Sequence, residues 1–541
     1  MDKLLLLGDE ALAQGALDAG LSGVYAYPGT PSTEITEYIQ RNQAAIERNV
    51  HREWSANEKT ALESALGMSY AGKRAMTCMK HVGLNVAADP FMNSALTGAN
   101  GGIIITVADD PSMHSSQNEQ DSRFYVKFAG IPALEPSNQQ EAYDMAFHAF
   151  ELSERYNTPV LIRLTTRLAH SRSGILRRDV LSENELKLPD DPNQFVLLPA
   201  IARKRYKHVL TQQKAFENES EQSPFNACHD GQDTSLGIIA CGLAYNYLME
   251  QWEDGICPYP VLKISQYPLP RKLVERIITA CNDILVLEEG MPLVEEMLRA
   301  FPAASDNMSA SLKGPSIQGR LSGALPRDGE LNPNLVAAAL GLNNKSWAAV
   351  PDIVATRPPE LCKGCSHRDA YHALNEALEP YGRGHVFSDI GCYTLGFLPP
   401  FQSINTCVDM GASITMAKGA ADAKFKPAIA VIGDSTFIHS GITGLLDAVW
   451  ENSNIVVMIL DNATTAMTGG QDHAGTGKLE DICKGLGVAE EHIRILKPLP
   501  KNHDKMVQTI KEEIAYKGVS VLILRRECIQ TLVRRKRQQK A

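Results

Sequence analysis

Short apolar runs alternate with longer amphipathic segments along the first third of the chain. The apolar runs, which predict strands, are residues 4–7, 24–27, 102–107 and 159–164. The amphipathic segments, which predict helices, are residues 58–71 and 140–156. Strands that alternate with helices are typical of a parallel sheet with helices on its faces, so the fold class we expect is α/β.

The same pattern divides the chain into three α/β blocks. A polar stretch without clear periodicity separates the first two blocks, and a stretch rich in Gly, Pro and Asn separates the last two. Further strands are predicted at 236–240, 260–263 and 284–288 in the second block and at 455–460 and 519–524 in the third. The boundaries are a first domain at 1–175, a linker at 176–232, a smaller domain at 233–305, a connector at 306–350, a third domain at 351–530 and a basic tail at 531–541.

Composition narrows the class of protein. The chain has 541 residues, of which 44% are hydrophobic and 21% charged, as in ordinary globular proteins. A net charge of −10 argues against general nucleic-acid binding, and the short basic run 534–537 is expected to be a solvated end. No apolar run is long enough for a membrane span, and no signal peptide is evident. Eleven cysteines without a secretion signal predict reduced thiols or metal ligands in a cytoplasmic protein.

Two polar residues follow neighbouring predicted strands in the third block. Asp434 follows Gly433 at the end of one predicted strand, and Asn462 lies just after the predicted strand 455–460. Because parallel strands end at the same edge, both side chains are expected to reach one hard cation such as Mg²⁺. The segment 441–450 is expected to be a helix whose N-terminus faces an anion. The alternative is a βαβ unit in which both residues only cap turns.

The residues around this pair strengthen the metal interpretation. Ser435 follows Asp434, and the backbone carbonyl of Thr464 offers a third ligand. Thr468, Gly469 and Gln471 form a flexible, polar loop suited to cover a cofactor. The spacing of Asp434 and Asn462 resembles the signature of enzymes that bind thiamine diphosphate (ThDP) through a metal ion.

A ThDP enzyme also needs a buried carboxylate, which hydrogen-bonds the pyrimidine ring and favours its imino form. Glu58 fits, because small and apolar residues follow it in the predicted helix 58–71. Taken alone, a glutamate at this place is more often a surface or N-terminal helix residue. Glu63 on the same helix is the competing candidate.

Five motifs carry a resemblance to a known family over nearly the whole chain. They are Tyr-Pro-Gly-Thr-Pro-Ser at 27–32, Asn-Glu-Lys at 57–59, Met-Lys-His-Val-Gly-Leu-Asn at 79–85, the segment 115–123, and Cys-Lys-Gly-Cys at 362–365. With them the sequence resembles the α subunit of indolepyruvate (arylpyruvate):ferredoxin oxidoreductase, within the 2-oxoacid:ferredoxin oxidoreductase superfamily.

The resemblance implies a ThDP-binding fold. Its parts would be a pyrimidine domain and a diphosphate domain built on parallel sheets, with a smaller transketolase-C-like domain between them. It implies Glu58 as the pyrimidine-activating glutamate, Mg²⁺ on Asp434, Asn462 and Thr464, and Thr30 and the Lys80–His81 loop near the substrate. The residues expected at the cofactors are Glu58, Cys392, Tyr393, Gly433, Asp434, Ser435, Asn462, Thr464, Thr468, Gly469 and Gln471. The ThDP site is compatible with assembly within one chain or between subunits.

Four cysteines are candidate ligands of one iron–sulfur cluster. Cys362 and Cys365 form a Cys-x-x-Cys pair, Cys392 lies in a Gly-flanked turn, and Cys528 follows the last predicted strand. Four thiolates are the usual ligands of a [4Fe–4S] cluster, and the superfamily places a proximal cluster near ThDP. Cys528 is the weakest match, with Cys483 as an alternative fourth ligand. A zinc site with four thiolates is the competing interpretation.

The implied reaction is oxidative decarboxylation of an aryl 2-oxo acid to an acyl-coenzyme A, with ferredoxin or another carrier taking the electrons. A small β subunit in an α₂β₂ assembly is the implied partner. Many α subunits of the family end in a ferredoxin-like domain with further Cys-x-x-Cys runs, whereas this sequence ends soon after Cys528. We therefore expect electrons to leave through a partner subunit or a separate carrier.

Substrate binding is a second departure from the pattern. The segment 107–111 lacks the Arg that pyruvate-type relatives use near the substrate carboxylate, so we expect a different contact. The alternative functions are a non-oxidative ThDP decarboxylase that releases aldehydes and a non-catalytic ThDP-fold subunit.

Overall fold

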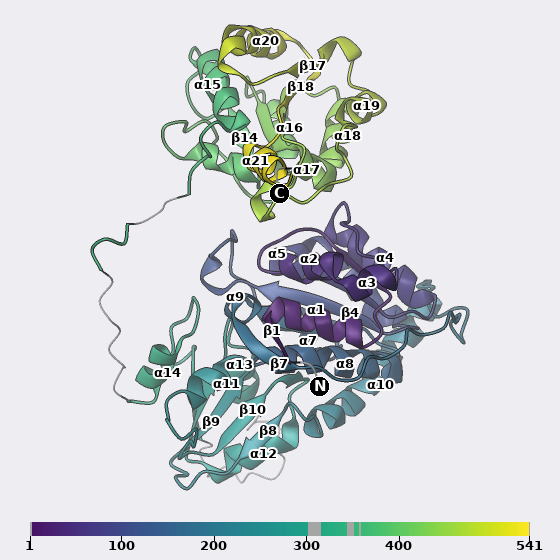
Figure 1. Cartoon of the computed structure of the whole chain (residues 1–541), viewed down its shortest axis with the longest axis vertical. Helices are drawn as coiled ribbons and strands as arrows, with labels where there is room; N and C mark the ends of the chain where they lie inside the picture. Colours follow the sequence, from purple (N-terminus) through teal and green to yellow (C-terminus); the bar gives the residue numbers. More distant parts are fainter. Residues whose placement is uncertain (1–2, 301–314, 343–350, 356–358, 540–541) are drawn as a thin grey trace. The chain divides into compact units, whose positions relative to one another are not determined.

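The computed structural model describes residues 3–300, 315–342, 351–355 and 359–539 (Figure 1). The chain forms two compact units, Met1–Ala348 and Ala349–Ala541, which are described separately below. Both are built of largely parallel sheets covered by helices, which confirms the expected α/β class. Among the described residues, no helix combines the length and the apolar character that a membrane span requires.

The first sheet of unit 1 has the strand order β11-β5-β6-β4-β3-β2 and is parallel except for β11. Its strands are β2 Gly23–Ala26, β3 Ala75–Lys80, β4 Ile103–Asp109, β5 Ala133–Leu134, β6 Val160–Thr165 and β11 Gln266–Tyr267. Its helices are α1 Gly8–Asp18, α2 Thr33–Arg41, α3 Gln43–Glu47, α4 Glu58–Tyr70, α5 His81–Val86, α6 Ala88–Thr97, α7 Arg123–Ala129, α8 Gln139–Tyr156 and α9 Thr166–His170. A separate antiparallel pair joins β1 Lys3–Leu7 to β7 Arg172–Leu176. The strands and helices predicted in this block are present within a few residues of their predicted ends.

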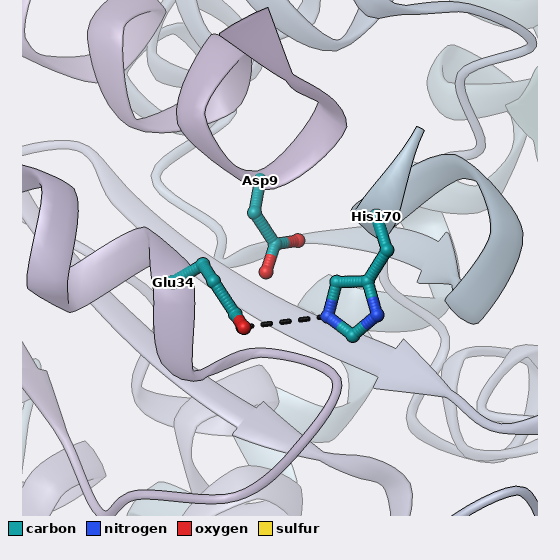
Figure 2. Close-up of side chains that lie close together, drawn as sticks. All are labelled: Asp9, Glu34 and His170. Atoms are coloured by element: carbon teal, nitrogen blue, oxygen red, sulfur yellow. Dashed lines mark ion pairs between the residues drawn. The ribbon is translucent and has the colours of Figure 1, made fainter. Parts of the chain in front are cut away.

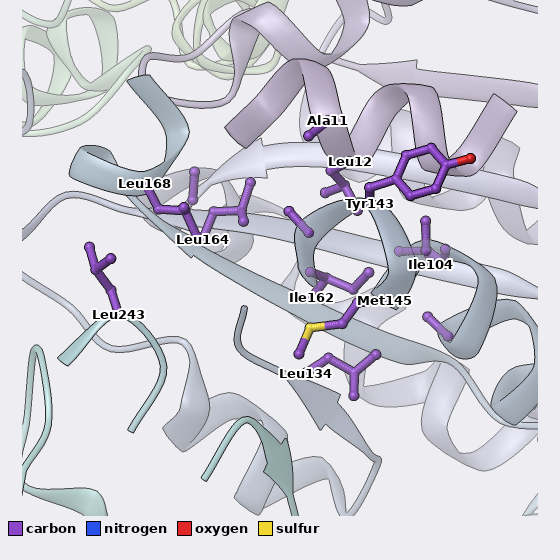
Figure 3. Packing of buried hydrophobic residues seen from close by; sticks show 14 of the residues in the cluster. Ala11, Leu12, Ile104, Leu134, Tyr143, Met145, Ile162, Leu164, Leu168 and Leu243 are labelled. Carbon is purple, nitrogen blue, oxygen red and sulfur yellow. The ribbon is translucent and has the colours of Figure 1, made fainter. Parts of the chain in front are cut away.

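Helices α1 and α8 pack tightly over this sheet. Leu12 and Tyr143 contribute fully buried side chains from the two helices, and Ile104 and Ile162 contribute them from the strands (Figure 3). The helices approach so closely that a Cβ at Gly15 would lie 2.2 Å from the Tyr143 carbonyl oxygen. Each large apolar side chain buried in this way stabilises the fold by about 1.5–3 kcal/mol. This core fixes the first sheet, whose edge carries the candidate residues of unit 1.

The second sheet of unit 1 has the order β13-β12-β9-β10-β8. Its strands are β8 Ala227–His229, β9 Leu236–Cys241, β10 Val261–Ile264, β12 Asp283–Leu287 and β13 Ser316–Gln318. Its helices are α11 Ala244–Met249, α12 Arg271–Ala280, α13 Leu293–Ala300 and α14 Pro333–Ala339. The predicted connector 306–350, part of which lies outside the described residues, supplies β13 and α14. Edge strands of three residues are too short to show an alternating pattern, so the sequence did not indicate β8 or β13.

The predicted linker 176–232, a polar stretch without clear periodicity, contains the helix α10, Pro199–Glu221. Only Val209, Phe216 and Ser220 of this helix are buried. A helix that buries so narrow a stripe shows little hydrophobic periodicity, which explains why the pattern was missed. Tyr156 stacks edge-on against Phe216, so the helix packs on α8 and is part of unit 1.

Unit 2 contains one fully parallel sheet in the order β14-β15-β16-β18-β17. The strands are β14 Val386–Ser388, β15 Ile429–Gly433, β16 Ile455–Asp461, β17 Ile493–Leu496 and β18 Val519–Arg525. The helices are α15 Ser366–Leu378, α16 Ala412–Asp422, α17 Asp434–Thr436, α18 Ile442–Trp450, α19 Leu479–Gly485, α20 His503–Ala515 and α21 Ile529–Gln538. The predicted basic tail 531–541 falls largely in α21, a helix with no buried residue.

Alternate residues of this sheet enter two different cores. Val431 and Met458 face the core that includes α15 and α20, whereas Ile432 and Ile459 face the core that includes α16 and α18. A sheet covered on both faces presents its loops only at the strand ends. The chemistry-bearing residues of unit 2 gather at the carboxyl ends, where open α/β sheets bind ligands.

Candidate functional site

The carboxyl ends of β15 and β16 bring the predicted metal ligands close together. The strands are parallel neighbours, and Gly433 pairs with Leu460, so Asp434 and Asn462 both follow the paired region. The helical run begins at Asp434, not at residue 441 as predicted. A π-helical turn, Phe437–Gly441, links α17 to α18. The N-terminal end of the helix therefore lies directly at the strand end.

Asp434 is a buried carboxylate, 2% exposed, whose pKa is raised because burial disfavours its charged form. The Nε2 atom of His473 lies 3.0 Å from its Oδ2 atom. The sequence reasoning did not single out His473, although it follows the candidate Gln471 by two residues. Gly433 is required here, since a Cβ would lie 2.6 Å from the ring of Tyr393. The oxygen atoms of Asp434 and Asn462 form a donor set that suits a hard cation.

The loop after Asn462 was expected to be flexible. In the structure its own hydrogen bonds hold it. The Thr464 N–H donates to Asn462 Oδ1 (3.2 Å), and the Thr464 hydroxyl donates to the carbonyl of Gln471 (3.0 Å). Thr468 donates to Gln471 Oε1 (2.5 Å), and Gln471 Nε2 donates back to the Thr468 carbonyl (2.8 Å). Because Thr464 and Gln471 are both buried, the loop presents a fixed polar surface beside Asp434 and Asn462.

Four candidate cysteines line one cavity of about 320 Å³ in unit 2. They are Cys362, Cys365, Cys392 and Cys528. Asn462 lines the same cavity, and its carbonyl accepts a hydrogen bond from the Cys528 N–H (3.0 Å). Cys483 lies elsewhere, fully buried in the apolar core with Leu479. The structure therefore brings together the four cysteines named first and separates the alternative ligand from them.

The thiols in this cavity are close enough to affect one another. Burial, together with the charges of the other three thiols and of Asp434, raises the pKa of Cys392 to about 12. Burial, Cys362 and Cys528 likewise raise the pKa of Cys365. A metal ion bound in the cavity would supply positive charge that favours the thiolate forms of Cys365 and Cys392.

A buried polar frame fixes the turn that carries Cys392. The Tyr393 hydroxyl donates to Asp389, whose other oxygen accepts from the Ser413 hydroxyl (2.6 Å) and the Gly411 N–H (3.1 Å). Burial raises the pKa of Asp389 to about 6. His367 also lines the cavity, and its burial lowers its pKa to about 4, so its ring is neutral at pH 7. Sequence reasoning identified Tyr393 and missed Asp389 and His367.

Helix α21 closes one side of the cysteine cavity. Gln530 Nε2 donates to the Cys362 Sγ atom (3.4 Å), and Arg534 donates to the carbonyl of Gly469 (2.8 Å). The basic run of this helix is therefore only partly a solvated end, because Arg534 ties the helix to the loop after Asn462. The amide of Gln530 gives one sulfur a hydrogen bond, which is a known means of tuning a metal bound by that sulfur.

Glu58 begins α4 in unit 1 and is 4% exposed. It lies against α5, where a Cβ on Gly83 would come within 2.6 Å of Glu58 Oε1. Glu63, in contrast, has a side chain that is 45% exposed and pairs with Lys59 on the surface of the helix. Of the two glutamates considered from the sequence, Glu58 is therefore the buried one.

Lys80 and His81 lie at the end of β3, next to Glu58. Burial lowers the pKa of Lys80 to about 8, although Asp110 and Glu58 oppose this shift, and the Lys80 ammonium donates to the Ser115 carbonyl (2.9 Å). The Ser115 hydroxyl in turn donates to the carbonyl of Thr30 (3.3 Å). His81 is buried, and its Nε2 atom lies 3.1 Å from the Asn118 carbonyl. Unit 1 thus gathers Thr30, Glu58, Lys80 and His81 at one edge of its first sheet.

A network of buried ion pairs at this edge was not foreseen from the sequence. Arg163 on β6 pairs with Asp109 (2.6 Å) and Glu135 (2.5 Å), and Arg123 on α7 pairs with Asp121 (2.5 Å) and Glu288 (3.0 Å). Both arginines also donate to the Glu289 carbonyl. The network joins the segment 115–123 to the second sheet of unit 1. The residues of this network are far apart in the sequence, so no local sequence pattern predicts the ion pairs.

Two domain families match the chain. Residues 14–195 match the family described as pyruvate flavodoxin/ferredoxin oxidoreductase, thiamine diP-binding. Residues 389–524 match the C-terminal TPP-binding domain of thiamine pyrophosphate enzymes. The first match includes Glu58, Lys80 and His81, and the second includes Cys392, Asp434 and Asn462.

Curated relatives match over almost the whole chain. Indolepyruvate oxidoreductase subunit IorA of Archaeoglobus fulgidus is 40% identical, covering 97% of this chain and 86% of the relative. The protein of the same name from Methanothermobacter thermautotrophicus is 39% identical, covering 98% and 87%. A solved 2-oxoglutarate:ferredoxin oxidoreductase from Magnetococcus marinus covers 63% of this chain and 65% of that chain at 16% identity and a TM-score of 0.49, a likeness too weak to support an argument.

Proposed function

Because the chain belongs to the family of indolepyruvate oxidoreductase subunit IorA, we propose that it catalyses the ThDP-dependent oxidative decarboxylation of an aryl 2-oxo acid. The balanced reaction consumes the 2-oxo acid, coenzyme A and two oxidised one-electron carriers. It yields the acyl-coenzyme A, CO₂, two reduced carriers and a proton. The family name supports the oxidoreductase class and a 2-oxo acid substrate, and the proposal adds the aryl preference, the cluster and the carrier.

ThDP is the cofactor that both matched domain families bind by description. When bound, it supplies a nucleophilic carbon and an electron sink for cleaving the bond next to a 2-oxo group. Asp434 and Asn462, with the backbone of Thr464, would hold the Mg²⁺ ion that anchors the diphosphate. The fit rests on a buried carboxylate and an amide oxygen at neighbouring strand ends, and on a helix that begins at Asp434 and favours an anion. Ser435 and the ordered loop Thr468–Gln471 would line the same end.

In unit 1, Glu58 would exchange a proton with a ring nitrogen of the pyrimidine: its carboxyl group would donate to the amino form of the ring, and its carboxylate would accept from the imino form. Its burial against Gly83 keeps water away from that hydrogen bond. Lys80 would replace the missing Arg as the contact for the substrate carboxylate, because its ammonium lies near Glu58 and donates to Ser115, whose hydroxyl contacts the Thr30 turn. His81 and Thr30 would orient the substrate from the same edge.

The observation that carries the oxidative function is the shared cavity in unit 2. Cys362, Cys365, Cys392 and Cys528 surround it, and Asn462 forms part of its wall. A [4Fe–4S] cluster held there by the four cysteines would lie next to the proposed Mg²⁺ ligand Asn462 and would supply an electron acceptor for the oxidation. The separation of Cys483 from this cavity supports Cys528 as the fourth ligand. The mutual effect of the thiols on their pKa values fits a cavity meant for a metal centre.

The proposal includes a partner. The curated relatives are named as subunits, which supports a small β subunit that completes an α₂β₂ assembly. Ferredoxin or a similar one-electron carrier would collect the electrons from the cluster. All eleven cysteines are free thiols in the described structure, which suits a reducing cytoplasm.

The deciding experiment is anaerobic purification of the chain with its small subunit, followed by iron, sulfide and zinc analysis and a visible spectrum. We expect about four irons per chain and a broad band that dithionite bleaches. Cys528→Ser should lose the cluster, whereas the matched variant Cys483→Ala should keep it. Zinc in the cavity would overturn the oxidative proposal. Release of an aldehyde, with no coenzyme A thioester formed and no viologen reduced, would point to a non-oxidative decarboxylase instead.

A further inference from the structure

Three ionisable side chains from separate helices meet in unit 1, away from the residues considered above. Asp9 lies in the first turn of α1, Glu34 in the first turn of α2, and His170 at the end of α9. Figure 2 shows the Asp9 carboxylate pointing into the space between Glu34 and His170. One ligand atom from each residue lies within 4.8 Å of the other two.

Asp9 is the unusual member of this group. Its side chain is 0% exposed, and both of its carboxylate oxygens lack a hydrogen-bond partner among the described residues. The charges that act on it most strongly are those of Glu34 and Glu10, which repel it. A buried carboxylate without a partner is costly, and the cost is removed by a proton or by a cation.

The spacing of Glu34 and His170 favours the cation. His170 Nε2 lies 3.4 Å from Glu34 Oε2, which is long for a charge-assisted hydrogen bond. Two ligands that each lie about 2.0–2.2 Å from one ion, at a tetrahedral angle, are about 3.3–3.6 Å apart. The observed separation of 3.4 Å falls in this range, although the same distance also fits an ion pair between the two residues.

We propose that Asp9, Glu34 and His170 bind one divalent transition-metal ion of the Zn²⁺, Mn²⁺ or Fe²⁺ class. One imidazole nitrogen and two carboxylates form a donor set that such ions accept, whereas Mg²⁺ and Ca²⁺ favour oxygen alone. The side chains of Glu34 and His170 are 32% and 35% exposed, which leaves the ion access to solvent and room for water ligands. Nothing in the proposed reaction requires this ion.

The ion would tie three helices together. α1 and α2 pack side by side in the core of the first sheet, and α9 follows the central strand β6. Glu34 stands four residues after Thr30, so an ion on Glu34 would also hold the turn that leads from β2 into α2. We therefore assign the site a structural role: it fixes the position of the Thr30 turn.

The test is a Mn²⁺ titration of the full-length chain, stripped with chelator and kept free of ThDP, with free Mn²⁺ measured by its EPR signal. Asp9→Asn and His170→Gln should each lower the number of bound Mn²⁺ ions by one. Each should also remove the part of the Mn²⁺-dependent rise in the protein's melting temperature that binding at this site produces. Asp434→Asn should leave this equivalent in place, which separates the site from the proposed diphosphate end. Glu47→Gln, an exposed carboxylate on α3, is the matched control and should change neither reading.

An unchanged number of Mn²⁺ equivalents in both Asp9→Asn and His170→Gln would overturn the proposal. Asp9 would then carry a proton, and Glu34 and His170 would form a simple ion pair. If Asp9→Asn does not fold, judged by circular dichroism, the half-exposed His170 carries the test alone. Because no reading depends on turnover, the result stands whatever becomes of the proposed oxidoreductase function.

Discussion

The first sheet of unit 1 and the sheet of unit 2 both concentrate charge at one edge, but they neutralise it differently. In unit 1, Asp109, Asp121, Glu135 and Glu288 are buried beside Arg123 and Arg163. In unit 2, Asp434 is buried beside His473, and four thiols surround one cavity. In unit 1 the chain itself supplies arginine cations beside the buried carboxylates. In unit 2 it supplies few cations beside Asp434 and the thiols.

The difference indicates what each edge is for. Paired guanidinium and carboxylate groups hold two sheets in a fixed relation, and they need nothing from outside. A buried carboxylate and clustered thiols are stable in their charged forms only with bound cations. This difference supports the proposal that the edge of unit 2 accepts metals, whereas the arginine network of unit 1 holds the segments around Glu58 and Lys80 in place.

The largest effect should come from removing Asp434, the proposed charged metal ligand of unit 2. Asp434→Ala takes away the charged ligand, and we expect Mg²⁺-dependent ThDP binding to fall by at least about two orders of magnitude. Isothermal calorimetry with and without Mg²⁺ measures the change. Asp447→Asn, an exposed carboxylate on α18, is the control. ThDP binding of wild-type strength in Asp434→Ala would remove this residue from the site.

Glu58→Gln should leave the fold intact and slow turnover by roughly 10²–10⁴-fold, because an amide cannot take part in the proton exchange. ThDP binding, followed by calorimetry, should change little. Glu63→Gln on the same helix is the matched control, since that side chain is exposed and forms an ion pair with Lys59 on the helix surface. If both variants kept full activity with 2-oxo acids, Glu58 would have no catalytic role.

Arg163→Met tests whether the arginine network of unit 1 is structural. It leaves Asp109 buried without its cation and Glu135 with only the longer contact to Arg123 (3.9 Å), and we expect a loss of about 3–5 kcal/mol in the free energy of unfolding. Arg155→Gln breaks the surface pair with Glu219, where the arginine side chain is 54% exposed, and should cost at most about 1 kcal/mol. Urea denaturation followed by circular dichroism compares the two. Equal costs would mean that burial adds nothing to the network.

Much of the fold was predictable because its strands and helices have strong local patterns. The apolar run at 455–460 became β16, and its neighbour in the sheet followed from the βαβ connection. Helix α10 was missed because it buries only a narrow stripe, and β8 and β13 were missed because they are short edge strands. Local patterning carries no information about elements that are stabilised mainly by contacts with distant residues.

The residues of the candidate sites likewise fall into those that the sequence predicted and those that it did not. Asp434, Asn462 and the cysteines were recognisable because their spacing along the chain is informative. His473, His367 and Asp389 were not, since each matters only through a neighbour that the fold supplies. The group of Asp9, Glu34 and His170 is the extreme case, because its three residues come from three helices and share no motif.

A smaller effect should come from the protonation of Lys80. Its pKa lies near 8 because burial disfavours the ammonium form, so the cation is present below pH 8 and lost as the pH rises above it. The KM for the 2-oxo acid should therefore rise above pH 8. Lys80→Met should raise KM by about 10- to 100-fold at pH 7 and remove this pH dependence. Lys59→Met, at an exposed position, should retain the wild-type profile, and a flat wild-type KM between pH 7 and 9.5 would exclude Lys80 from carboxylate binding.

The smallest effect we expect concerns Gln530, which donates to the Cys362 sulfur from α21. A hydrogen bond to a ligand sulfur withdraws charge from a cluster and raises its reduction potential. Gln530→Leu should keep the full iron content and shift the potential to a more negative value, as read by a redox titration of the EPR signal. Gln538→Leu, near the far end of α21, is the control for general effects on the helix. An unchanged potential in Gln530→Leu would mean that the amide does not act on the metal centre, whereas loss of iron would mean that α21 is needed to keep the cavity closed.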